Sequence, residues 1–178
     1  MVSVEVIAIL LSGISISASL FYYANVLQNA NKTRQAALFM DLYRTYRDPV
    51  FKKQYNEILS WRYVDFNDFW NKYGEQNNPD AWVTYQTVAS YFNGIGVLLK
   101  QGLIEINMIE ELLAPTVYMA WMRMGPVAKG FKELSATKSF RALQDDVEGY
   151  GRPKNLRPWS GFEYLNDELR KREAQNNP

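Results

Sequence analysis

An uncharged stretch near the N-terminus constrains this chain more than any other feature. It extends over residues 6–31, and its apolar centre is residues 6–26. As an α-helix the centre would be about 31 Å long, which matches the roughly 30 Å hydrocarbon core of a bilayer. Three aromatic residues lie near its distal end, where aromatic belts occur in membrane proteins: Phe21, Tyr22 and Tyr23. We therefore predict that residues 1–30 form a transmembrane anchor in contact with the lipid bilayer.

The charges that flank this segment predict its orientation. Only Glu5 and the amino terminus precede it, whereas Lys32 and Arg34 follow it closely. The positive-inside rule then places the N-terminus outside and the rest of the chain in the cytoplasm, with one pass through the plasma membrane. Lys32 and Arg34 are predicted to lie at the membrane surface. Arg44 is farther along the chain and is expected to pair with Asp41, three residues before it.

Small residues form a stripe within the predicted anchor. Ala8, Ser12, Ser15 and Ser19 are spaced by four, three and four residues, which places them on one face of a helix. Such a face allows close approach of a second helix, from a protein partner or from another copy of the chain. The alternative is that the serines are only tolerated, because each hydroxyl can bond to a carbonyl one turn earlier.

Two other interpretations of the uncharged stretch stay open. A cleaved signal peptide would carry a basic region ahead of its apolar part, and none is present, although Ser17-Ala18-Ser19 is a possible cleavage sequence. A buried core helix would be shorter or would show a polar face.

The absence of histidine and cysteine from the chain excludes many kinds of site. It removes the usual zinc sites, His- or Cys-ligated haem, Cys-ligated iron–sulfur clusters and His-dependent triads. With 20 Lys and Arg against 19 Asp and Glu, the chain also lacks the basic balance of a nucleic-acid-binding protein. We predict no cofactor, no metal and no nucleic acid as partners.

The remaining sequence predicts an all-α protein, with a compact helical domain over residues 31–174 and a frayed tail over residues 175–178. The helix that leaves the membrane should continue to Asp48-Pro49. Asp48 is expected to cap the next helix, with Pro49 in its first position. Asp65 should cap a short helix over residues 66–73, and Asn78 a longer one that ends near Gly102.

The longer helix contains no charge over residues 81–99, but its polar residues share one side. We therefore predict a core helix and not a second membrane span. Its apolar side should bury Phe92, Ile95 and also Trp82 and Leu99, and Gly96 on that side should permit close helix packing. Trp121 is expected in the core as well.

Helix signals continue towards the C-terminus. Asn107 and Glu110 have capping-box spacing. Pro115 should end or kink the helix that follows, and Pro126 should interrupt it again. A helix over residues 139–148, a loop over residues 149–158 and a helix opened by a second capping box complete the chain. That box is Ser160 and Glu163, and its helix should end near Glu173.

Three polar groupings suggest chemistry, and each has a simpler explanation. Ser135 and Lys138 match a serine-nucleophile motif without its companion motifs. Asp65 and Asp68 have the spacing of a helix cap and first turn, where acids favour the helix dipole. A third grouping lacks the pattern of a calcium loop and is taken as a solvated face: Asp145, Asp146 and Glu148.

Several segments together resemble a known protein family. They are residues 31–35 (NKTRQ), 38–51 (LFMDLYRTYRDPVF), 61–74 (WRYVDFNDFWNKYG) and 91–104 (YFNGIGVLLKQGLI), followed by Trp121. The chain resembles an uncharacterised family of small archaeal and bacterial proteins with one membrane helix and a helical body. The resemblance implies that architecture and no catalytic residues.

The sequence therefore predicts a membrane-anchored helical protein that acts as an interaction or accessory subunit, with no catalytic activity of its own. One alternative is an enzyme that uses carboxylates or an oxygen-ligated metal. A second alternative is a self-assembling membrane effector, for which the small-residue stripe is the only indication.

Overall fold

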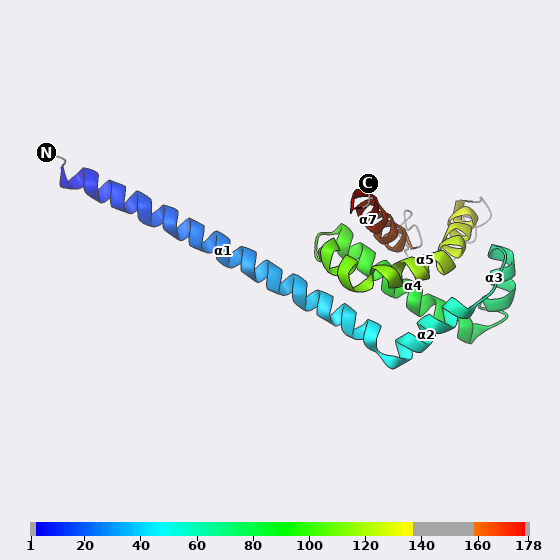
Figure 1. Cartoon of the computed structure of the whole chain (residues 1–178). Coiled ribbons are helices and arrows are strands. Elements are labelled where there is room, and N and C mark those ends of the chain that lie inside the picture. The colour runs from blue at the N-terminus through cyan, green and yellow to red at the C-terminus, as the bar shows by residue number, and fades with distance from the viewer. Residues whose placement is uncertain (1–2, 137–158, 177–178) are drawn as a thin grey trace, which may run out of the picture.

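The computed structural model describes residues 3–136 and 159–176, apart from the side chains at positions 5–8, 10, 135 and 136. Within this part all regular elements are helices, joined by short turns and without a strand, which confirms the predicted all-α class (Figure 1). The six helices are α1 (Val4–Arg47), α2 (Pro49–Ser60), α3 (Phe66–Tyr73), α4 (Pro79–Lys100), α5 (Ile106–Ala136) and α7 (Ser160–Asn176). The predicted helix over residues 139–148 and the loop over residues 149–158 lie outside the described residues.

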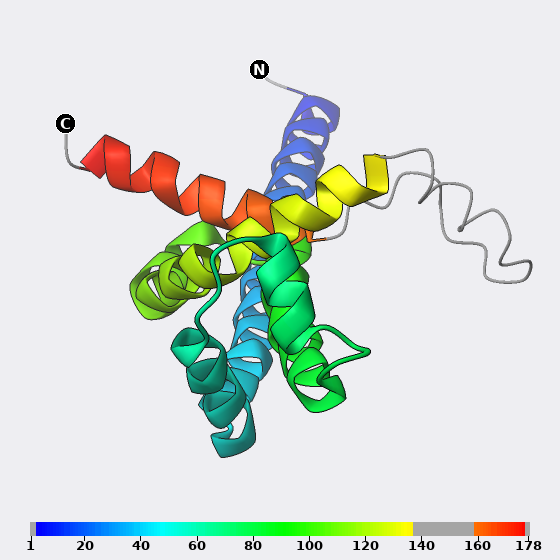
Figure 2. The ribbon, with the colours of Figure 1, turned by 90° about the vertical axis from the view of Figure 1, so that its right-hand side faces the viewer.

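Helix α1 dominates the shape of the molecule. It has 44 residues and projects far from the other helices, which gather around its C-terminal end (Figures 1 and 2). Gln35 of α1 bonds to the body, because its Nε2 donates to the carbonyl oxygen of Gly102 at 3.2 Å. We refer to residues 4–34, which precede this bond, as the arm, and residues 35–47 fasten α1 to the body.

The local start signals of three helices are confirmed. Asp48 Oδ1 accepts from the amides of Val50 and Phe51 and caps α2. Asp65 Oδ1 accepts from Asp68 N at 2.8 Å and caps α3. At α4, Asn78 Oδ1 accepts from Ala81 N at 3.2 Å. Each cap satisfies an amide that the first turn of a helix leaves without a partner.

Helix α4 lies in the core of the body, as its uncharged sequence predicts. Phe92 and Ile95 are fully buried. Phe92 stacks on Phe162 of α7, with ring centroids 5.0 Å apart. Trp82, Leu99 and Trp121 are only half-buried, contrary to prediction. Amphipathic spacing identifies the inward side of a helix, but how deeply each position lies depends on which helices pack over it.

Helix α5 differs from its prediction in two ways. It begins at Ile106, so Asn107 lies inside the first turn and does not cap it. It also continues through Pro115 and Pro126, so Pro115 does not end the helix and Pro126 does not interrupt it. Both prolines lie on the exposed side, where water can bond the carbonyls that they leave without a partner. The other side of the helix is buried through residues 109–128, which offsets the cost of the two prolines: Ile109, Leu113, Val117, Ala120, Met124 and Val127.

Helices α4 and α7 cross at two glycines. A Cβ atom on Gly96 would lie 1.7 Å from the carbonyl oxygen of Gly161, so only glycine allows this approach. The prediction for Gly96 is thereby confirmed. Asn93 of α4 caps the start of α7, because its Oδ1 accepts from the amides of Gly161 and Phe162 at 2.9 and 3.4 Å.

The predicted capping box of α7 is therefore wrong. Ser160 is the first residue of the helix, and the Glu163 carboxylate pairs with Lys132 of α5. The helix continues to Asn176, beyond its predicted end near Glu173. Contacts with α5 hold this end, since Asn176 Nδ2 donates to Glu110 Oε1 at 3.2 Å.

Tyrosine hydroxyls fix the base of the arm to the body. Tyr91 of α4 donates to the carbonyl oxygen of Leu42 in α1 at 3.0 Å. Tyr46 of α1 accepts from Thr116 Oγ1, and Tyr55 of α2 donates to the Thr116 carbonyl oxygen, both at 3.0 Å. These bonds join α1, α2, α4 and α5, so the direction of the arm is set by the body.

Candidate functional site

The arm is the most unusual surface of the molecule. Its large apolar side chains that the structure describes are between 43% and 82% exposed: Val4, Ile9, Leu11, Ile14, Ile16, Leu20, Phe21, Tyr22, Tyr23, Val26 and Leu27. At 3.6 residues per turn these positions fall on nearly all sides of the helix. An ordinary surface helix has a single apolar side, which it buries against the body. The arm differs, because the body could cover only one of the sides on which its apolar residues lie.

The small-residue stripe lies on this arm. Ser12, Ser15 and Ser19 are exposed on one side of the helix, whereas the side chain of Ala8 lies outside the described residues. Ser19 Oγ donates to the carbonyl oxygen of Ser15 at 2.8 Å, and Ser17 Oγ to that of Gly13 at 2.9 Å. The arm thus satisfies these hydroxyls by itself, in the way that lets serine enter an apolar surrounding.

A search of the described residues finds no helix with the length and the apolar character needed to cross a bilayer. Side chains at positions 5–8 and 10, which belong to the predicted anchor, are not among those described. The transmembrane anchor over residues 1–30 stays a prediction.

A groove lies where the arm joins the body. Its lining residues come from α1 and from the turn between α4 and α5: Asn31, Arg34, Gln35, Leu38, Gly102 and Leu103. The volume of the groove is about 210 Å³. Gly102 has a φ of +68°, the left-handed conformation that ends α4 and turns the chain towards α1. We refer to this feature as the arm-base groove.

The structure separates the two predicted membrane-surface residues. Arg34 lines the arm-base groove, whereas Lys32 is exposed outside it. Neither side chain forms a hydrogen bond or an ion pair with the described part of the chain. The predicted pair of Arg44 and Asp41 is confirmed, with Nη1 and Oδ1 3.1 Å apart.

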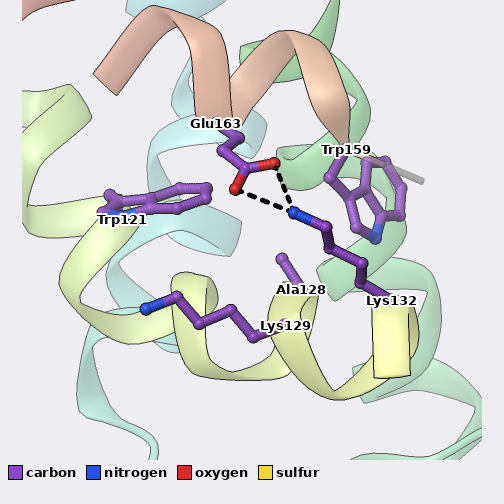
Figure 3. Close-up of a pocket in the computed structure, with 6 residues that line it drawn as sticks. All are labelled: Trp121, Ala128, Lys129, Lys132, Trp159 and Glu163. Carbon is purple, nitrogen blue, oxygen red and sulfur yellow. Dashed lines mark hydrogen bonds and ion pairs between the residues drawn. The ribbon is translucent and has the colours of Figure 1, made fainter. Parts of the chain in front are cut away.

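A second hollow lies between α5 and α7 (Figure 3). Trp121 and Trp159 flank it, and the Lys132 Nζ contacts the two Glu163 oxygens at 3.3 and 3.5 Å. Its free volume of about 10 Å³ is that of about one water molecule. The ion pair crosses this hollow and joins α5 to α7.

The predicted acidic grouping on α3 serves the helix itself. Asp68 Oδ2 accepts from Val64 N at 3.0 Å and from Lys72 Nζ at 2.9 Å. The hydrogen bond from Lys72 lowers the pKa of Asp68. With Asp65 engaged as the cap, both carboxylates bond to groups of α3 or of the residues just before it. This confirms the simpler explanation.

The other candidates for chemistry cannot be placed as a site. Lys138 and the cluster of Asp145, Asp146 and Glu148 lie outside the described residues, as does the side chain of Ser135. Among the described residues there is no group of three or more acidic side chains that could hold a metal ion.

Sequence reasoning missed most of the arm-base groove. Gln35 and Gly102 are 67 positions apart, and neither lies in a local motif that predicts their contact. The NKTRQ segment contains three of the lining residues, but their sharing of a groove depends on how α4 packs against α1. In comparisons with models of protein families, with curated proteins and with solved structures, the chain has no match.

Proposed function

We propose that this protein is a single-pass membrane protein whose arm lies in the bilayer and whose body acts beside the cytoplasmic leaflet as an interaction or accessory domain. One observation carries the proposal: the apolar side chains of the arm are exposed on nearly all sides over residues 4–27. Such a surface is unfavourable in water by about 25 cal/mol for each Å². Lipid covers all sides of a helix at once, whereas a single partner helix covers one.

Charge supports the proposed orientation. Lys32 and Arg34 follow the apolar part of the arm within eight residues of Val26 and are exposed. Basic residues of this kind are retained on the cytoplasmic side during insertion. The body, which begins to pack at Gln35, then stands directly next to that leaflet.

An exposed stripe on α5 supports an interaction role for the body. Leu112, Met119 and Met122 are between 46% and 60% exposed, and Pro115 lies between them on the same side. Met side chains adapt to varied surfaces and are frequent at protein contacts. A photo-reactive residue at Met122 should form a discrete protein adduct in intact membranes, and one at exposed Glu57 should not. Equal labelling at both positions would contradict the role of the stripe.

Membrane insertion is tested by alkaline carbonate extraction of cell membranes. The unaltered protein should remain in the membrane pellet. The double substitution Ile14→Lys and Ile16→Lys should release it, because each charge near the bilayer centre costs about 3 kcal/mol. Met40→Lys is the matched control, since Met40 is exposed on α1 beyond the arm, and it should stay in the pellet. Extraction of the unaltered protein would reject the proposal.

Orientation is tested with single cysteines, which the chain permits because it contains none. A membrane-impermeant maleimide applied to intact cells should label Ser3→Cys. It should label Asn56→Cys, on the exposed side of α2, only after the membrane is opened. The reverse pattern would invert the topology.

A further inference from the structure

We infer that the arm-base groove binds the phosphate group of an anionic phospholipid, with the guanidinium of Arg34 as its main donor. This inference rests on the proposed insertion of the arm, which brings the groove to the membrane surface. It adds a specific lipid site to an otherwise non-specific anchor.

The depth of Arg34 matches the headgroup layer. It follows Val26 by eight residues, which is about 12 Å along the helix. Side chains on a helix point back towards its N-terminus, and long basic side chains extend towards the polar layer. The guanidinium therefore lies between the end of the hydrocarbon core and the body, where lipid phosphates are found.

The donors of Arg34 are available for a ligand. An arginine carries five N–H groups and no acceptor, and Arg34 uses none of them within the described part of the chain. The nearby carbonyl of Gly102 already accepts from Gln35 Nε2 at 3.2 Å. A phosphate oxygen is thus the natural partner, since arginine binds phosphates through two parallel hydrogen bonds.

The walls of the groove suit a headgroup. The side-chain amide of Asn31 lies on the arm beside Arg34, and Leu38 and Leu103 supply apolar surface. The volume of the groove is about 210 Å³. This is ample for a phosphate with part of its glycerol, and too small for an acyl chain.

The surrounding charge also favours an anion. The C-terminal end of α4 would repel it, because that end of a helix is partly negative. Lys100 in the last turn of α4 offsets this effect, and Lys32 adds a second exposed positive charge. Glu105, just after the turn, is the acidic residue nearest to it in sequence.

The test uses the full chain in an uncharged detergent, with a fluorophore on Gln101→Cys, the residue just before Gly102 of the groove. Short-chain phosphatidylglycerol, phosphatidylcholine of the same chain length and glycerol 3-phosphate are titrated separately. Phosphatidylglycerol should bind most tightly. Arg34→Gln should weaken the affinity for phosphatidylglycerol about tenfold or more, as expected for the loss of charge-assisted hydrogen bonds. Arg44→Gln is the control, because Arg44 is on the same helix and pairs with Asp41. The affinity of Arg44→Gln for phosphatidylglycerol should remain within about twofold of that of the unaltered protein.

Each other outcome overturns the inference. Equal affinities of the unaltered and Arg34→Gln proteins would show that Arg34 is not the donor. Equal binding of glycerol 3-phosphate would show that the groove takes a soluble phosphate and not a lipid. Circular dichroism confirms that the variants are folded. Carbonate extraction distinguishes a failure of the lipid-site inference from a failure of the proposed membrane insertion. Arg34→Gln should stay in the membrane pellet whichever way the titration ends.

Discussion

Asn93 joins two helices through one side-chain oxygen. Its Oδ1 accepts from Gly161 N at 2.9 Å and from Phe162 N at 3.4 Å. Helix α7 thereby obtains its cap from α4, although the two residues are 68 positions apart. We expect Asn93→Ala to lower the free energy of unfolding by about 1–2 kcal/mol.

Asn93→Asp is the matched variant for this prediction. A carboxylate keeps the acceptor and interacts favourably with the positive start of a helix. Its stability in urea denaturation should stay close to that of the unaltered protein. Equal losses for Asp and Ala would mean that the cap contributes nothing and that packing at this position dominates.

Tyr55 makes stability sensitive to alkaline pH. Burial raises its pKa to about 12, with a smaller contribution from Tyr46. The folded state favours the neutral form of Tyr55. The contribution of Tyr55 to the free energy of unfolding is therefore complete below pH 10 and is lost as the pH rises towards 12. Tyr55→Phe should cost about 1 kcal/mol at pH 8, because the hydrogen bond to Thr116 is lost.

The difference in the free energy of unfolding between the unaltered protein and Tyr55→Phe should then narrow between pH 10 and 12. Phenylalanine has no proton to lose. In the unaltered protein, Tyr55 ionises at a lower pH in the unfolded state than in the folded state, so the folded state loses relative stability as the pH rises. Urea midpoints at pH 8 and pH 11.5 measure this change. A difference that is the same at both pH values would contradict the assignment. Tyr63, whose pKa burial also raises to about 12, is present in both proteins and cancels in the comparison.

At the scale of elements, two glycines of α4 should respond in opposite ways to the same substitution. Gly96→Ala places a methyl group 1.7 Å from the backbone of α7, so the helices must separate. We expect a loss of 1–3 kcal/mol or more and faster hydrogen exchange in α7. Gly94→Ala meets nothing within 4 Å and should stabilise the helix by up to about 1 kcal/mol.

Thermal unfolding followed by circular dichroism measures both changes. The two substitutions have the same chemistry and lie two residues apart, so a difference between them reports the crossing alone. If Gly96→Ala were as stable as Gly94→Ala, the close approach of α4 and α7 would be wrong.

At the scale of the whole molecule, the arm and the body should be energetically independent. Changing Ile9, Ile14, Ile16 and Leu20 to Gln removes much of the apolar surface of the arm while keeping a good helix former. We expect this variant to be a monomer in buffer without detergent, by light scattering. The unfolding temperature of the body should not change, because these exposed side chains are not among those that pack on its core. A lower unfolding temperature would show that the arm packs against the body in solution.

The sequence by itself determined the features that depend on neighbours along the chain. The caps at Asp48, Asp65 and Asn78 bond amides two or three residues away, so their residue types predict the helix starts. The end of α4 needs only the positive φ of Gly102, which glycine adopts without strain. The unbroken uncharged run likewise predicts the long α1.

Only the tertiary structure decided the features that join distant segments. The cap of α7 comes from Asn93, the glycine crossing needs Gly161, and the arm-base groove needs Gln35 next to Gly102. In α5, burial of one side keeps Pro115 and Pro126 inside a helix that local propensity would break. The physical reason is common to all four. A local signal fixes backbone angles over one turn, whereas contacts between residues far apart in the sequence depend on which faces meet when the helices pack.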